Sequence, residues 1–194
     1  MGTWMQPTKG QVAASAKIVE AIVQTLHTDK GTHAETAIGA AARMAGTFLF
    51  RSLRLPVTDA LPGTPVLSEA ANEHGPLLVQ TFGVGLVHEG IDPTTIKPDL
   101  HIPEQNQPQL SVVQMQEKLE PPLRAIARRY RLDDRQAAHA CALAAAKLVR
   151  MTAAVLEPRT GFAVAAYGFI EGAKTMPIAL PPPAPKRPWW RFGR

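Results

Sequence analysis

The sequence lacks the features that mark secreted and membrane proteins. It contains a single cysteine, Cys141, which excludes a disulfide within the chain. No stretch reaches the roughly 18 consecutive apolar residues that a membrane-spanning helix requires, and residues 1–10 contain no apolar core of a secretory signal. Because disulfides are rare in reducing compartments, these absences predict a cytoplasmic protein.

Acidic residues are missing from the last 14 positions, residues 181–194, which contain one lysine and three arginines. The whole chain has a net charge of +5, and this tail contributes four of those five charges. Residues 1–180 are therefore nearly neutral. The high isoelectric point describes a terminal segment and does not predict a general nucleic-acid-binding surface.

Motifs that specify a chemistry are also missing. Residues 168–175 read GFIEGAKT, which differs from a phosphate-binding P-loop by Ala173 in place of its second glycine. His33 and Glu35 form the H-x-E pattern of zinc deaminases, but that site needs two further cysteines. The six histidines show no metal-ligand spacing. The sequence therefore predicts no catalytic residue, no metal and no cofactor.

Capping boxes are present instead, and each precedes an apolar pattern with a spacing of three and four residues. In such a box a Ser, Thr or Asp side chain accepts from the backbone amide three residues later, and a Glu or Gln there reaches back. The four pairs are Thr8/Gln11, Thr32/Glu35, Ser111/Gln114 and Asp133/Gln136. Four boxes followed by helical periodicity predict a helical protein.

The expected fold is all-α, a compact bundle of about six helices that occupies residues 1–180. The helices are expected near residues 8–26, 33–53, 68–90, 111–130, 133–155 and 158–175. The third helical stretch should be broken at Gly75-Pro76, where Pro76 would start a new helix that ends near Gly90. Pro121-Pro122 should break or kink the helix that starts at Ser111, and residues 77–87 also fit a strand. The side chains expected to be buried include Val12, Ala16, Val19, Val23 and Leu26 in the first helix, and Met151 and Val155 in the fifth.

Two proline-rich segments stand out from the helical pattern. Residues 91–109 contain a proline every five residues, and apolar side chains predict that this connection packs on the body: Ile91, Ile96, Leu100 and Ile102. Residues 181–194 form a basic tail that is expected to be disordered and to contribute nothing to the fold. Its Trp189, Trp190, Arg191 and Phe192 predict contact with a protein partner or an anionic membrane surface.

A stripe of arginines indicates the main alternative function, which is DNA binding. Its members recur every three or four residues: Arg124, Arg128, Arg131 and Arg135. Residues 123–140 resemble a helix-turn-helix, in which Arg135, Gln136 and His139 would face a major groove. The resemblance departs from the usual pattern at Arg131, where such turns carry glycine. The other interpretation is a corner between two helices with solvated arginines.

Alanine and glycine crowd two helices on more than one face, around residues 34–46 and 137–146. Because a small bundle has few interior places, one such face predicts a homodimer. The favoured function is a non-catalytic helical protein-interaction domain. The alternatives are a small DNA-binding regulator that uses residues 123–140, and an enzyme or ligand binder whose site is assembled from residues distant in sequence.

Overall fold

The computed structural model describes residues 6–57, 59–96 and 102–180. In these ranges the regular structure is entirely helical, and β structure is limited to two isolated bridges. The elements are α1 (Lys9–Leu26), α2 (Ala34–Leu53), α3 (Glu69–His88), the 3-10 turns η1 (Pro93–Thr95) and η2 (Glu104–Asn106), α4 (Val112–Arg129), α5 (Asp134–Thr152) and α6 (Pro158–Ala173). The all-α prediction is confirmed, and residues 77–87 are helical.

Three of the four predicted capping boxes form at the start of a helix. They belong to Thr8/Gln11, Ser111/Gln114 and Asp133/Gln136. The Thr32/Glu35 box is wrong, because α2 is capped by His33, whose Nδ1 accepts from the Thr36 amide at 3.3 Å. Glu35 instead meets His33 and Asn106 from the connection between α3 and α4. A local pattern could not reveal that distant partner.

The buried face of α1 differs from the predicted one. It contains Gln11, Ala14, Ser15, Ile18, Val19 and Ile22, whereas Val12 is 46% exposed and Ala16 is exposed. Gln11 and Ser15 can be buried because they find acceptors in Gln136 O and Val12 O. Met151, in the last turn of α5, and Val155 are likewise exposed, and Val155 lies beyond the end of this helix at Thr152. Apolar periodicity alone misses polar side chains whose hydrogen bonds are satisfied.

Prolines are accommodated inside two helices. Pro76 lies within α3, and Pro121 and Pro122 lie within α4, without ending either helix. An interior proline removes a helical hydrogen bond and costs about 3 kcal/mol or more. Apolar burial on both sides offsets that cost: Ala71, Leu78, Phe82 and Leu86 in α3, and Met115, Leu119 and Leu123 in α4. The predicted break at Pro76 is therefore wrong.

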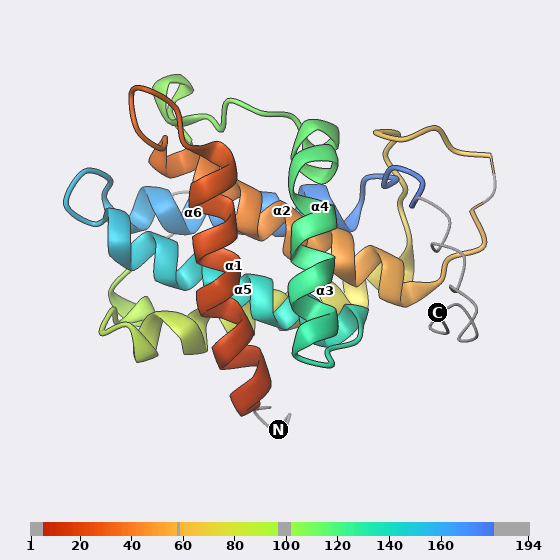
Figure 1. Ribbon diagram of the computed structural model, residues 1–194, viewed down its shortest axis with the longest axis horizontal. Coiled ribbons are helices and arrows are strands. Elements are labelled where there is room, and N and C mark those ends of the chain that lie inside the picture. The colour runs from red at the N-terminus through yellow and green to blue at the C-terminus, as the bar shows by residue number, and fades with distance from the viewer. Residues whose placement is uncertain (1–5, 58, 97–101, 181–194) are drawn as a thin grey trace, which may run out of the picture.

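The central helix of the bundle is α2, which contacts all five other α-helices. Every residue from 35 to 50 is buried. In α5, residues 137–146 are also buried without exception, between α1, α2, α3 and α6. Figure 1 shows α1 and α4 crossing in front of α2 and α5. Both alanine-rich helices are thus buried within one chain. The apolar faces from which a homodimer was predicted pack against other helices of the same chain.

Close backbone approach explains the small residues of α2 and α6. A Cβ on Gly172 would collide with the Arg43 carbonyl, and one on Gly46 would collide with the Ala173 amide. One on Gly168 would lie 2.7 Å from the Ala42 Cβ. The glycines of the P-loop-like segment therefore serve helix packing, and α6 continues through that segment to Ala173.

The proline-rich connection is fixed to α2 at its second end. The Gln109 amide donates to Thr36 Oγ1 at 3.0 Å, and the Leu110 carbonyl accepts from Arg43. Pro108 covers Gly39, where a Cβ would lie 2.9 Å from the proline ring. Ile91, Ile96 and Ile102 pack against the core as predicted, while Leu100 lies outside the described residues.

After α6 the chain runs back along the segment that precedes α3. The Val66 amide donates to Lys174 O at 2.7 Å, and the Met176 amide donates to Thr64 O at 2.8 Å. Ile178 is then held by α4 and α2, because its amide donates to Gln116 Oε1 and its carbonyl accepts from Arg51. The predicted tail, residues 181–194, lies outside the described residues. Within the described ranges, none of the helices has the length and apolarity needed to span a membrane.

Candidate interaction groove and the polar groups around it

An apolar groove of about 490 Å³ opens between the first half of α3 and the end of α6. Its apolar lining comes from Ala71, Gly75, Pro76, Val79, Phe169, Ile170 and Ala173, and its polar lining from Asn72, Gln80 and Lys174. The volume lies within the roughly 300–1,000 Å³ of typical ligand sites. Its lining is predominantly apolar, with polar groups at the margin.

The groove combines a fixed floor with exposed walls. Phe169 and Ala71 are buried, and the Phe169 ring meets the Phe82 ring edge-on at 5.6 Å between centroids. Ile170 is 54% exposed and Val79 is 36% exposed. Gly75 has open space above it, since a Cβ there would meet nothing within 4 Å. A rigid floor below exposed aliphatic walls is the arrangement of a docking surface for an apolar side chain.

Two acidic residues of α3 are close in sequence to the lining of the groove: Glu69 comes two positions before Ala71, and Glu73 directly follows Asn72. Glu69 and Glu73 are both exposed, and neither forms an ion pair with another residue in the described part of the chain. Lys174 lies at the α6 side of the groove. The α3 margin therefore presents negative charge next to an apolar surface.

The predicted arginine stripe does not form one free surface. Arg124 reaches back into the body, where its Nε contacts Glu120 Oε1 and its Nη1 contacts Asp134 Oδ1, both at 2.9 Å. Its guanidinium also lies over the Phe48 ring, 5.2 Å from the centroid. Arg135 bonds His74 Nδ1 at 2.9 Å. Arg124 therefore holds α4, α5 and α2 together.

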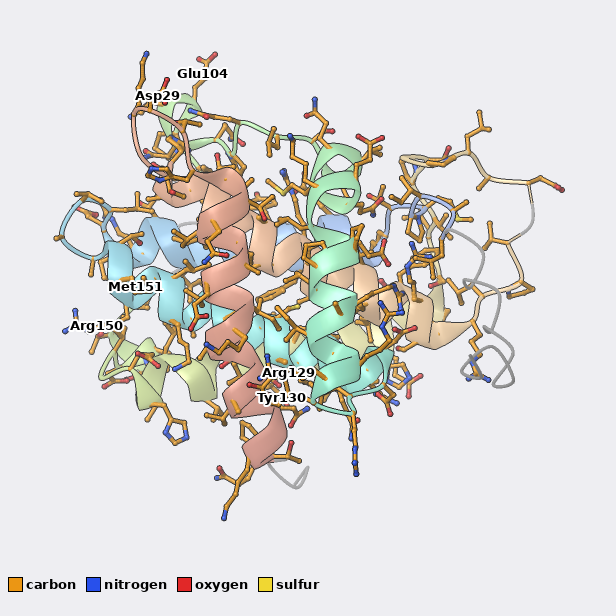
Figure 2. The ribbon with its side chains drawn as sticks, in the orientation of Figure 1. Asp29, Glu104, Arg129, Tyr130, Arg150 and Met151 are labelled. Carbon is orange, nitrogen blue, oxygen red and sulfur yellow. The ribbon has the colours of Figure 1, made fainter. Side chains whose placement is uncertain are left out.

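The turn after α4 does carry exposed arginines. Arg128 and Arg131 are exposed, and Arg131 takes the left-handed conformation with a φ of 55°, which explains why glycine is usual at this position. Figure 2 shows Arg129 and Tyr130 at this end of α4. The helix that would read DNA bases is nevertheless buried from residue 137 to residue 146. Only its first turn is available to a major groove, which needs an accessible helix face.

A buried ion-pair network joins Glu120 of α4 to Arg51 in the C-terminal half of α2. The Glu120 carboxylate is buried and accepts from Arg51 Nε at 2.5 Å and Arg51 Nη2 at 2.7 Å. Arg124 Nε donates a third hydrogen bond to this carboxylate, at Oε1. Both oxygens are therefore occupied by guanidinium donors, and this network connects the helices without offering a free acid or base.

His33 and Glu35 at the start of α2 form the most enzyme-like group. His33 Nε2 lies 3.2 Å from Glu35 Oε2, and His33 Nδ1 lies 2.8 Å from Thr36 Oγ1. Nδ1 also accepts from the Thr36 amide, so the ring proton is on Nε2. Both ring nitrogens are thus already engaged, and Thr36 Oγ1 accepts from the Gln109 amide. The group anchors the connection, and no nitrogen remains to act as a base.

His139 is buried between α3 and α5. The Thr81 hydroxyl donates to Leu77 O at 2.9 Å and must therefore accept from His139 Nδ1 at 2.7 Å. Burial, assisted by the charge of Arg135 and opposed by Asp133, lowers the pKa of His139 below its ordinary value. His139 is consequently a neutral hydrogen-bond donor within the core.

Two further groups, the guanidinium of Arg43 and the thiol of Cys141, are paired or buried. Arg43 Nε contacts Glu171 Oε2 at 2.7 Å in a cleft of about 400 Å³ beneath the connection. Cys141 is fully buried, and this burial raises the pKa of its thiol. The described residues contain no group of three or more His, Cys, Asp or Glu side chains that could hold a metal ion. A buried thiol with a raised pKa is a poor nucleophile.

Comparison with known proteins gave no match. Models of protein families, curated proteins and solved structures were each compared with the chain, and none of them matches it.

Sequence reasoning missed the groove, although one signal was present. Phe169 and Ile170 are adjacent in α6 and must point to different faces of the helix. A helix that is apolar on more than one side is enclosed or lies at an interface. The second wall, Val79, comes from α3, about 90 positions earlier, so the sequence could not indicate that the two walls meet.

Proposed function

We propose that this chain is a non-catalytic protein-interaction domain of the cytoplasm, which binds an apolar segment of a partner in the groove between α3 and α6. The observation that carries this proposal is the pair of exposed aliphatic walls, Val79 and Ile170, above the rigid Phe169 floor. Exposed apolar grooves with polar margins are typical of docking sites for anchoring side chains.

The buried polar groups support a non-catalytic role. Glu120 and Arg124 connect helices, His33 and Glu35 hold the connection, and His139 donates to Thr81. Each of these groups has a structural role in the fold. Catalysis by a nucleophile and a base requires a pair of groups that remain available to a substrate.

The proposal is tested by selecting binders from a random 12-residue peptide display library on the immobilised full-length chain. We expect the selected peptides to share a large apolar residue. Ile170→Asp should weaken their binding by about 30-fold or more, the effect of removing a hot-spot contact. Met151→Asp is the matched control, because Met151 is 62% exposed and lies outside the groove.

Peptides that bind Ile170→Asp as tightly as the unmodified chain would overturn the proposal, and so would a failure to select any peptide. The position of Met151 at the end of α5 is seen in Figure 2. Since Ile170 and Met151 are both exposed and both in helices, circular dichroism should show that each variant keeps the helical fold.

A further inference from the structure

We propose that in the free chain the groove is occupied by the chain's own C-terminal segment, residues 181–194, which places its aromatic side chains against Val79 and Ile170. This inference rests on the proposed function of the groove, and it names the occupant that a partner must displace.

The C-terminal segment is long enough to reach the groove. Lys174 lines the groove, and the described chain ends six residues later at Leu180. At roughly 3.3–3.6 Å per residue, Leu180 is at most about 20 Å from Lys174 along the chain, and Trp189 can extend about 30 Å beyond Leu180. The aromatic residues can therefore return to the groove within the same chain.

The path of the chain brings this segment out on the correct side. Residues 174–176 run beside residues 63–66, which lead directly into α3. In Figure 1 the end of α6 and residues 174–180 lie toward the same side of the bundle as the chain that enters α3. The first half of α3 is one wall of the groove, so the segment starts close to the surface it is proposed to cover.

The C-terminal segment and the start of α3 have opposite charges. Residues 181–194 contain four basic residues and no acid: Lys186, Arg187, Arg191 and Arg194. Glu69 and Glu73 supply the opposite charge at the α3 margin, without ion-pair partners in the described part of the chain. Lys174, the cation in the lining, lies on the α6 side, so basic residues are favoured next to α3.

The C-terminal segment also contains large apolar side chains that suit the apolar lining of the groove. Two of the three tryptophans of the chain, Trp189 and Trp190, lie in this segment together with Phe192. Tryptophan side chains with a neighbouring arginine are the residue types that most often anchor an interface. The groove provides an apolar lining of matching character around Phe169 and Ile170. Proline in the segment reduces the entropy lost on binding.

Occupation within one chain has a regulatory consequence. A segment connected by a short linker meets its site at an effective concentration in the millimolar range. A partner that uses the same groove must therefore compete with it, and its apparent affinity falls by the fraction of chains in which the groove is open.

The test uses a fluorescein-labelled synthetic peptide of residues 181–194 and fluorescence anisotropy. The receptor is the full-length chain with Trp189→Ser, Trp190→Ser and Phe192→Ser, which should leave the groove open. We expect the peptide to bind this variant at least about tenfold more tightly than it binds the unmodified chain. Adding Ile170→Asp should abolish the binding, whereas adding Met151→Asp should preserve it.

Each other outcome is decisive. Equal binding to the unmodified chain and the triple variant would overturn occupation within the chain but leave the groove as a docking site. Absence of peptide binding, while library-selected peptides still bind through Ile170, would reject this segment as the occupant and keep the proposed function. If neither kind of peptide responds to Ile170→Asp, both proposals are wrong.

The oligomeric state distinguishes occupation of the groove within one chain from occupation by the segment of a second copy. Light scattering of the unmodified chain should give the 20.9 kDa mass of one copy. A doubled mass that returns to one copy in the triple variant would show that the segment occupies the groove of a second copy, which contradicts the proposal. If Ile170→Asp unfolds, Val79→Asp tests the other wall in the same way.

Discussion

Gly172 in α6 lies directly against the backbone of Arg43 in α2, with no room for a side chain between them. A Cβ at position 172 would collide with the Arg43 carbonyl, and neither backbone can move without separating the two helices. This crossing sets the position of the last turn of α6, where Ile170 and Ala173 line the groove. Packing of two helices therefore determines the shape of the proposed binding site.

Gly172→Ala should destabilise the fold by at least about 2 kcal/mol, because overpacking a rigid contact costs roughly 1–3 kcal/mol or more. Urea denaturation measures this change. Gly83→Ala is the matched control: it also lies in a helix, but a Cβ there meets nothing within 4 Å. The control should gain about 0.5–1 kcal/mol from helix propensity. Equal effects of the two substitutions would contradict the close crossing.

Glu120→Gln should destabilise the chain by about 3–5 kcal/mol, since it leaves the Arg51 and Arg124 guanidiniums without their shared buried carboxylate. The same urea measurement applies. Glu20→Gln breaks the exposed pair with Lys17 and should change stability by less than about 1 kcal/mol. A small effect at Glu120 would mean that its network contributes little to the association of α2 and α4.

Stability should fall as the pH is lowered through about 6.5, the ordinary pKa of histidine in an unfolded chain. The folded-state pKa of His139 is lower, chiefly because burial disfavours its charged form, so the unfolded state binds the proton first. The stability it contributes is complete above pH 6.5 and is lost between that value and its lower folded-state pKa. His139→Gln should flatten this part of the unfolding free-energy profile. If the free energy of unfolding of His139→Gln depends on pH as steeply as that of the unmodified chain, His139 is not the cause of this pH dependence.

Local features of the fold could be predicted from the sequence, and those that depend on distant partners could not. The caps of α1, α4 and α5 form because a box needs only residues three positions apart. The buried face of α1 was misjudged because Gln11 is buried against the backbone of Gln136, 125 positions away. Glu35 was misassigned for the same reason, since its partner Asn106 comes from the connection.

Only some of the candidate interaction residues could be predicted from the sequence. The residues singled out from sequence include Arg124, which the structure places in an ion-pair network, and Arg128 and Arg131, which it leaves exposed. No observation tests the homodimer that the sequence predicted, and the alanine faces that suggested it are buried in one chain. The proposed occupation of the groove within one chain predicts a single copy instead. The groove depends on the crossing of α3 and α6, and no segment contains both of its walls.

The most direct test of the groove is the methyl NMR spectrum of the full-length chain during titration with a library-selected peptide. We expect the largest shifts at the methyl groups of Val79, Ile170 and Ala71, which line the groove, and no shift at Met151, which is exposed elsewhere. Ile170→Asp should remove the shifts at Val79 and Ala71 while leaving the fold intact, because Ile170 is largely exposed. Peptide-induced shifts that avoid these three residues and appear at another surface would contradict the assignment of the groove as the interaction site.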